Sequence, residues 1–288
     1  RSPGRSRIPR CGSRTRPGSR RPSASVSTRV VDFTFTSIGY TPGRFPKTET
    51  FELPFLMTNG EQTSVAMQRF VEENTLNEFA GTKPICVITH GPGLLHLKNP
   101  VEKLDDLKGM KVRGGSRIVN DMLAAFGAEP ITIPITQLAE ALTTGVLDGT
   151  TLPWDITLNY KTSELVHHHV EFGGKHGLYT QVLMFVMSGE AYNALPPDLQ
   201  ALFDKEPGVD IARQLGVITD ERDRIARQAA VDLGNSIVTL DEAETQRWVD
   251  ASQIAVENWY KESESRGVDG RALHARAKEL VAEESGIA

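Results

Sequence analysis

The 288-residue sequence lacks the features that mark several common classes of protein. It has only two cysteines, Cys11 and Cys86, so it offers neither a disulfide framework nor a CxxC motif. No apolar run approaches the length of about 20 residues that a membrane-spanning helix needs, and no secretory hydrophobic region stands at the start. Because G-x-S-x-G, P-loop and G-x-G-x-x-G motifs are also missing, we expect no enzyme, no catalytic residue and no cofactor.

Charge is distributed unevenly along the chain. Nine of the 32 Lys and Arg residues fall in residues 1–29, which contain no acid, so residues 30–288 carry 23 basic against 37 acidic side chains, a net of −14. An acidic body of this kind argues against a nucleic-acid partner. Residues 1–25 are mainly Arg, Ser, Pro and Gly, and we expect a disordered basic head. A basic arm for nucleic acid or an anionic membrane is the alternative.

The stretch 107–154 alternates strand and helix patterns. MKVR and EPITI predict strands, separated by an amphipathic helix that Gly127 ends, and a second helix is expected from Gln137 to Thr144. Alternation in steps of about fifteen residues is typical of α/β units. VVDFTFTSI, PICVIT and LYTQVLMFVMS predict further strands, the last long enough to cross between lobes, and residues 209–288 predict charged helices.

Arg113 ends one of the expected strands, which is where ligands of α/β sheets bind. Its guanidinium can offer two parallel N–H donors to a carboxylate. Trp154 follows a proline and could face Arg113 across a cleft as an apolar wall. The alternatives are a core tryptophan and a surface arginine paired with Asp105, Asp106 or Glu129.

Five other residues are secondary candidates for ligand binding. Tyr40, Tyr179 and Phe185 could supply aromatic walls, although each could equally belong to the core. His90 and Gly91 begin a His-Gly-Pro-Gly bend, where backbone can approach a ligand and an imidazole can donate to an anion.

Histidines suggest a rival hypothesis, a metal-dependent or acyl-transfer enzyme built around His90, His96 and the run His167, His168 and His169. Consecutive side chains on an extended segment point to opposite sides, so three adjacent imidazoles cannot share one ion, and no H-E-x-x-H spacing occurs. We therefore expect no metal site. A further alternative is that the acidic helical C-terminal region serves as an interaction surface.

An ordered set of motifs spans roughly Val30 to Leu280: GYTPGRFP, FELPFL, LDDLKGMKVR, FGAEPITIP, LAEALTTGVLDGTTLPW and YNALPPDLQALFD. In these the sequence resembles the DctP-like substrate-binding proteins of tripartite (TRAP-type) transporters. The resemblance implies a two-lobed, clam-shell, periplasmic-binding-protein-like α/β fold with crossing strands and long C-terminal helices. It also implies a periplasmic protein that binds a small organic acid through a salt bridge to Arg113 and delivers it to the membrane subunits of the transporter.

The expected lobes are residues 26–90 plus 181–220 and residues 91–180 plus 221–288. Family members normally have a signal peptide, a strand and a helix before the equivalent of Val30, so we expect the first lobe to lack its N-terminal strand. Two further departures concern the pocket: Leu152 stands where many members have Asn, and residues 90–97 lack the second Arg that many members supply. We therefore expect a monocarboxylate ligand with an apolar or aromatic body.

Overall fold

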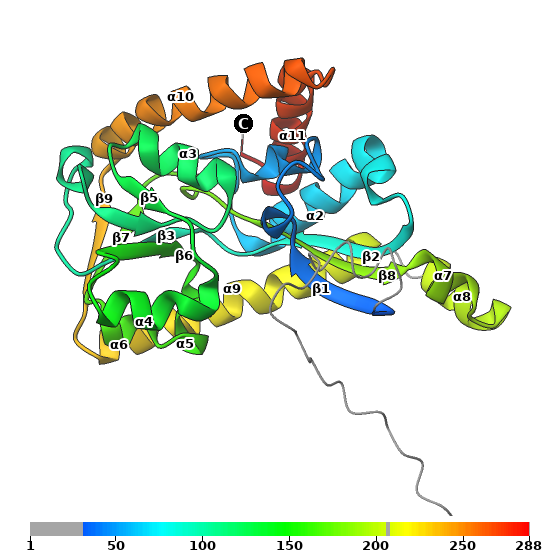
Figure 1. Cartoon of the computed structure of the whole chain (residues 1–288), viewed down its shortest axis with the longest axis horizontal. Coiled ribbons are helices and arrows are strands. Elements are labelled where there is room, and N and C mark those ends of the chain that lie inside the picture. The colour runs from blue at the N-terminus through cyan, green and yellow to red at the C-terminus, as the bar shows by residue number, and fades with distance from the viewer. Residues whose placement is uncertain (1–30, 206–207, 288) are drawn as a thin grey trace, which may run out of the picture.

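Two β-sheets with helices packed around them make up the protein, shown in Figure 1 as a computed structural model that describes residues 31–205 and 208–287. The predicted two-lobed α/β fold is confirmed. The basic head expected at residues 1–25 lies outside the described residues. Within the described part of the chain, no helix combines the length and apolar character needed to cross a membrane.

The first sheet is antiparallel and, among the described residues, has the strand order β1-β8-β2, with bounds Phe33–Ser37, Val182–Ser188 and Thr82–Thr89. All three lie where β-branched and aromatic runs predict strands. Because β8 is distant in sequence from its two partners, this lobe is built from separate stretches of chain. Helix α2 (Gly60–Phe70) covers the sheet, and π and 3₁₀ turns extend it to Phe79.

The second sheet has the strand order β5-β4-β6-β3-β7-β9, with bounds Glu129–Ile131, Lys111–Arg113, Gly149–Leu152, Leu94–Leu97, His168–Phe172 and Ser236–Leu240. β4 runs parallel to β5 and β6, whereas β3 is antiparallel to β6 and β7. The parallel part is the predicted strand–helix alternation, with α3 (Arg117–Ala125) and α4 (Leu138–Thr143) as its helices. Parallel strands place the carboxyl end of β4, and with it Arg113, at one edge of the sheet.

Helix α3 shows how local sequence fixes an element beside the site. Ser116 caps it by accepting a hydrogen bond from the backbone N–H of Val119. Its apolar face is buried against the second sheet and against α10 (Glu242–Ser265). Gly127 follows the helix with φ +85°, a conformation that glycine adopts without strain.

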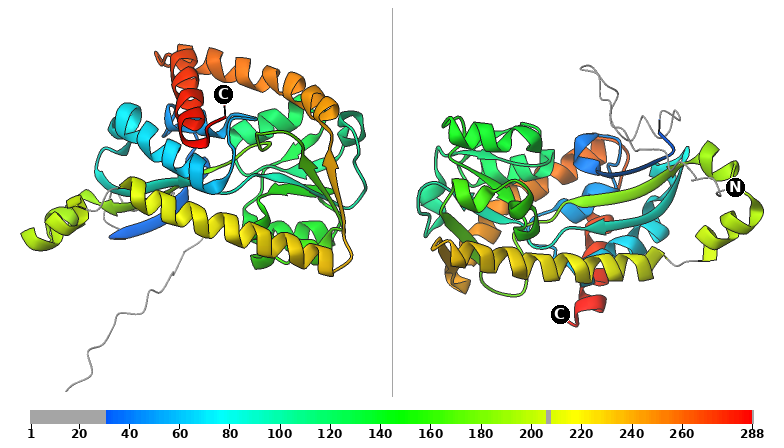
Figure 2. Two further views of the ribbon diagram at one scale, coloured as in Figure 1. Left: turned by 180° about the vertical axis from the view of Figure 1, so that it is seen from behind. Right: turned by 90° about the horizontal axis from the view of Figure 1, so that it is seen from below.

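Helix α9 (Gly208–Asp232) runs past both sheets, as the two orientations in Figure 2 show. It packs closely against α2 and against α5 (Trp154–Asn159). The shorter helices are α6 (Thr162–Leu165) in the second lobe, and α7 (Gly189–Asn193) and α8 (Pro197–Lys205), which project from the end of the first sheet (Figure 1).

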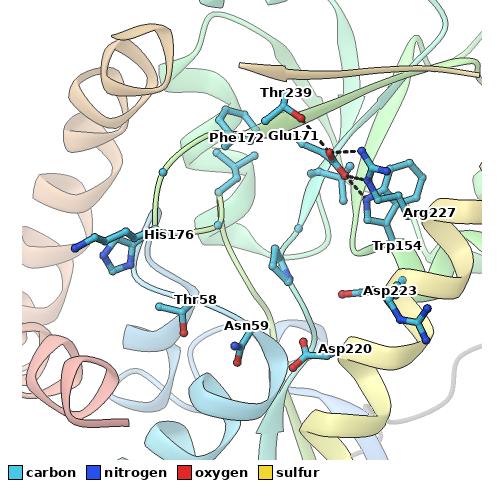
Figure 3. A pocket seen from close by; sticks show the side chains of 18 residues that line it. Thr58, Asn59, Trp154, Glu171, Phe172, His176, Asp220, Asp223, Arg227 and Thr239 are labelled. Atoms are coloured by element: carbon cyan, nitrogen blue, oxygen red, sulfur yellow. Dashed lines mark hydrogen bonds and ion pairs between the residues drawn. The ribbon is translucent and has the colours of Figure 1, made fainter. Parts of the chain in front are cut away.

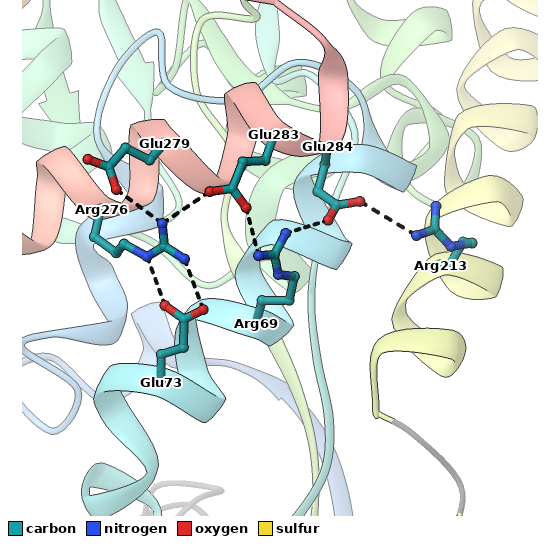
Figure 4. A network of polar contacts seen from close by, with 7 residues as sticks. All are labelled: Arg69, Glu73, Arg213, Arg276, Glu279, Glu283 and Glu284. Carbon is teal, nitrogen blue, oxygen red and sulfur yellow. Dashed lines mark hydrogen bonds and ion pairs between the residues drawn. The ribbon is translucent and has the colours of Figure 1, made fainter.

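Helix α11 (Gly270–Ser285) packs against α2, with Ala277, Leu280 and Val281 in the same core as Phe70 and Val87. The predicted lobe division placed residues 221–288 with the second lobe, so α11 departs from it. α11 lies in the first lobe because its apolar face packs against α2, the helix that covers the first sheet. Figure 4 shows a network of ion pairs that reinforces the contact between α2, α9 and α11, formed by Arg69, Glu73, Arg213, Arg276, Glu279, Glu283 and Glu284.

Candidate functional site

A cavity of about 540 Å³ lies where β1, β4, β8 and α9 come together. Most of its lining is aliphatic or aromatic, and the apolar side chains come from both lobes: Phe35, Tyr40, Ile88, Ile135, Leu152, Ile156, Tyr160, Leu183, Phe185, Leu215 and Ile218. Phe35 and Phe185 stack with ring centroids 4.2 Å apart, across the β1–β8 pair. Leu152 therefore contributes to an apolar wall.

Arg113 is the most deeply buried charged residue that lines this cavity, with 2% of its surface exposed. Its Nε donates to the backbone carbonyl of Ile133 at 3.1 Å, and its Nη1 is buried without a hydrogen-bond partner among the described residues. Among the described residues Arg113 forms no ion pair with Asp105, Asp106 or Glu129: Asp105 pairs with Arg247, and Asp106 accepts from the backbone N–H groups of Glu102 and Lys103. A buried guanidinium without an anion is costly, so this side chain favours the entry of one.

Sequence reasoning missed two charged residues of the same cavity, Asp155 on α5 and Arg222 on α9. Burial raises the pKa of Asp155, and the positive charge of Arg222 acts in the opposite direction. No short motif joins these residues, because 66 positions separate them and only the packing of α5 on α9 brings them together. Arg222 therefore adds a second arginine to the lining of the cavity, from a helix distant in sequence.

The imidazole of His90 lines the cavity, but its nitrogens are already engaged. Nδ1 lies 2.6 Å from the carbonyl oxygen of Gly91, and Nε2 accepts a hydrogen bond from the backbone N–H of Gln181 at 3.0 Å. These contacts fit a neutral ring with its proton on Nδ1, and burial lowers the pKa of His90 to about 4. His90 therefore holds together the two chain segments that cross between the lobes.

Gly91 and Tyr179 lie beside the cavity but are not part of its lining. A side chain at Gly91 would collide with the carboxylate of Asp223, so this position allows α9 to approach the crossing segment. Tyr179 is fully buried, with its ring edge-on to His90 at 5.5 Å between centroids, and burial raises the pKa of its hydroxyl.

Trp154 does not line the Arg113 cavity. It faces a second cavity of about 590 Å³, shown in Figure 3, where its indole N–H donates to Glu171 at 2.9 Å. The same carboxylate accepts from Arg227 and from Thr239. Trp154 is 5% exposed, so most of its side chain belongs to the core, the alternative that the sequence left open.

Two aspartates of α9 border the second cavity. Asp220 accepts hydrogen bonds from the backbone N–H groups of Gly60 and Glu61, the first turn of α2. Asp223 accepts from the backbone N–H of Asp155 at 2.7 Å, and burial raises its pKa to about 8. The wall between the two cavities is therefore made from the start of α5 and the middle of α9.

The remaining histidines are spread over separate environments. Nδ1 of buried His96 lies 2.8 Å from Nδ1 of His169, and Nε2 of His96 lies 3.2 Å from the carbonyl oxygen of Leu152. His167 instead lies at the surface against Asn235. In the described ranges, no group of three or more His, Cys, Asp or Glu side chains is arranged to hold a metal ion.

The chain matches the family model described as bacterial extracellular solute-binding protein, family 7 (DctP), over residues 18–263. It also resembles the crystal structure of a TRAP solute-binding protein from Rhodoferax ferrireducens T118 in complex with copurified benzoate. The two are 37% identical, with a TM-score of 0.89 and coverage of 92% of this chain and 83% of the other. A marine metagenome TRAP solute-binding protein specific for aromatic acid ligands, in complex with metahydroxyphenylacetate, is 35% identical, with a TM-score of 0.89 and coverage of 93% and 85%.

Curated relatives are more distant. The C4-dicarboxylate-binding periplasmic protein DctP of Rhodobacter capsulatus is 24% identical over 191 residues, which cover 65% of this chain and 56% of the relative. Two other curated solute-binding proteins are matched over 67% and 63% of their own lengths.

Proposed function

The chain belongs to bacterial extracellular solute-binding protein family 7, the DctP family of TRAP solute-binding proteins, and from this premise we propose that it binds an aromatic monocarboxylate in the Arg113 cavity. The ligand's carboxylate pairs with the guanidinium of Arg113, and its ring occupies the apolar part of the cavity. The observation that carries this proposal is the burial of Arg113, with its Nη1 unpartnered, in a cavity walled by aromatic and aliphatic side chains.

The lining of the cavity supports an aromatic body over a small aliphatic acid. Phe35 and Phe185 form a stacked pair in its wall, and Tyr40 and Tyr160 add two further rings. The ring of an aromatic ligand can pack on these side chains in the offset or edge-on arrangements that aromatic rings favour. The relatives at 37% and 35% identity are described with benzoate and with aromatic acid ligands, whereas the C4-dicarboxylate-binding relative is 24% identical.

The biological role that we propose is delivery of this acid, outside the cytoplasm, to the membrane subunits of a TRAP transporter. Ligand binding between the lobes would favour a closed arrangement because only there do both lobes contact the ligand. Arg113 and Phe185 belong to different sheets, so one ligand that touches both would join the lobes.

Substitution of Arg113 tests the proposal. We expect Arg113→Ala to weaken benzoate binding by about 100-fold or more, because the ligand carboxylate would be desolvated without its bidentate partner. Arg113→Lys keeps the charge but not the planar fork, and we expect an intermediate loss. Isothermal titration calorimetry measures both, with thermal unfolding as a check that the variants fold.

Arg247→Ala is the matched control, because this arginine is exposed on α10 and lines neither cavity. Its affinity for benzoate should equal that of the unmodified protein. If Arg113→Ala bound aromatic acids as tightly as the control, the proposed site would be wrong.

A further inference from the structure

Two charged side chains in the Arg113 cavity retain polar atoms without a hydrogen-bond partner among the described residues. Arg222 forms no hydrogen bond or ion pair with any described residue, and Oδ1 of Asp155 is buried without a hydrogen-bond partner. Nearby charges on α9 are paired in other directions: Arg224 with Glu221, and Arg227 with Glu171. A buried, unpartnered carboxylate oxygen costs free energy unless a ligand donates to it.

Asp155 is held in place through its backbone and through its carboxylate, which accepts a hydrogen bond from the backbone N–H of Ile156. Its backbone N–H donates to Oδ1 of Asp223, and the preceding Pro153, which also lines the cavity, restricts the backbone. The carboxylate is therefore a fixed acceptor and not a side chain on a mobile loop. Arg222 is exposed at the rim of the cavity and is close enough to Asp155 to stabilise its negative charge, but the two form no ion pair.

We propose that Asp155 and Arg222 recognise a hydroxyl group on the ring of the bound acid, so that the cavity selects hydroxylated aromatic monocarboxylates. A hydroxyl group can donate its proton to Asp155 while its lone pairs accept from the guanidinium of Arg222. One hydroxyl group that reaches both side chains would therefore be recognised by both charges.

The same pair disfavours a second carboxylate on the ligand. An anion near Arg222 would also meet the negative charge of Asp155, and like charges at short range repel. Arg113 has no such acid paired with it, so it remains the position for the ligand's single carboxylate. The inference rests on the proposed function, since it concerns the hydroxyl group of a ligand whose carboxylate is bound by Arg113.

Calorimetry with a small set of acids tests selection in the unmodified protein. The set is benzoate, the 3- and 4-hydroxybenzoates, their methyl ethers, and the two corresponding benzene dicarboxylates. We expect at least one hydroxybenzoate to bind about ten- to a hundredfold more tightly than benzoate, the range for a hydrogen bond to a charged group. Its methyl ether should lose this advantage, because an ether oxygen cannot donate to Asp155.

Variants of Asp155 test whether this residue is responsible for the selectivity for a ring hydroxyl group. In Asp155→Ala, the ratio of hydroxybenzoate affinity to benzoate affinity should fall to about threefold or less. In Asp155→Asn, the hydroxybenzoate should bind more weakly and the dicarboxylate more tightly, since the repelling charge is gone and Arg222 remains. Opposite changes for two ligands cannot come from a general loss of structure. Glu164→Gln, an exposed carboxylate on α6, is the matched control and should change neither affinity.

The outcomes separate the two proposals. If no aromatic acid binds the unmodified protein, the proposed function fails and this inference fails with it. If benzoate binds through Arg113 but hydroxylation gives no advantage, or the advantage survives in both Asp155 variants, the hydroxyl-selective site is wrong and the proposed function stands.

Discussion

Trp154 and Asp155 are adjacent in the chain, yet their side chains line different cavities. They begin helix α5, and successive residues of a helix project about 100° apart, so the two side chains point to opposite sides of the wall between the cavities. The sequence predicted that Trp154 faces Arg113 across a cleft, whereas Asp155 and not Trp154 lines the Arg113 cavity. It could not show which neighbouring residue faces which side, because that depends on how α5 packs against α9.

Trp154→Phe distinguishes a wall of the ligand site from a structural tryptophan. We expect this substitution to lower the free energy of unfolding by about 1–3 kcal/mol, because the carboxylate of Glu171 loses the indole donor. Benzoate affinity should stay within about threefold, the effect of a substitution away from the site. Urea unfolding and calorimetry measure the two quantities.

Trp248→Phe is the control for Trp154→Phe, because that indole also donates to a glutamate, Glu244, within the second lobe. It should show a similar loss of stability and unchanged binding. A tenfold weaker affinity for benzoate in Trp154→Phe at unchanged stability would instead place Trp154 in contact with the ligand.

The charged helices predicted over residues 209–288 include α9, which ends at Asp232. Its role as the common neighbour of both cavities was not predictable. The buried positions of α9 are mostly small or polar, Ala212, Gly216, Asp223, Ala226 and Ala230, and such a stripe does not reveal what packs on it. In contrast, Arg113 was placed correctly at the end of β4, because strand–helix alternation is a local signal that fixes where each strand ends.

The close crossing of α9 and α2 depends on Gly216. A Cβ atom there would lie 2.5 Å from Cα of Glu61 and 2.6 Å from the carbonyl oxygen of Gly60, both backbone atoms that cannot rotate away. We expect Gly216→Ala to destabilise the protein by about 1–3 kcal/mol, the usual cost of overpacking, although alanine has the higher helix propensity.

Chemical unfolding measures the effect of Gly216→Ala, and Val217→Ala on the exposed side of the same turn is its control. The control should change stability by no more than about 0.5 kcal/mol. An increase in the stability of Gly216→Ala would show that helix propensity outweighs the contact, and that α2 and α9 can separate without cost.

At the scale of the whole molecule, more segments of the chain contribute to both lobes than the sequence predicted. α9 runs past both sheets, α10 packs against α3 and α11, and α11 returns to the first lobe (Figure 2). The division into residues 26–90 plus 181–220 and residues 91–180 plus 221–288 stays a prediction, with α11 as the exception described above. A periodic apolar pattern identifies α11 as a helix but cannot say which of two sheets its apolar face will cover.

Stability against pH also belongs to the whole molecule, because it sums over every group whose pKa changes on folding. Burial lowers the pKa of His90, His169 and His274 to about 4, so these groups destabilise the fold as the pH falls from about 6.5 towards 4. Burial raises the pKa of Glu52 to about 7 and that of Asp223 to about 8. These carboxyl groups bind a proton more tightly when folded, so their contribution to stability is lost as the pH rises from about 4 to 8.

From pH 6.5 to about 7.5 the unfolded histidines lose their remaining protons while the buried rings stay neutral, and this contribution is the same in the unmodified protein and in an Asp223 variant. The difference between the two proteins over pH 6.5–8 therefore reports the carboxyl group of Asp223. We expect Asp223→Asn to remove part of the fall in unfolding free energy over this interval, by about 1–2 kcal/mol, because asparagine stays neutral and can still accept from the N–H of Asp155. Urea unfolding at several pH values between 6.5 and 8 measures the slope. Asp232→Asn, an exposed acid at the end of the same helix, should keep the slope of the unmodified protein. Parallel curves for Asp223→Asn and the unmodified protein would show that Asp223 is ionised throughout, and that burial does not protonate the wall between the cavities.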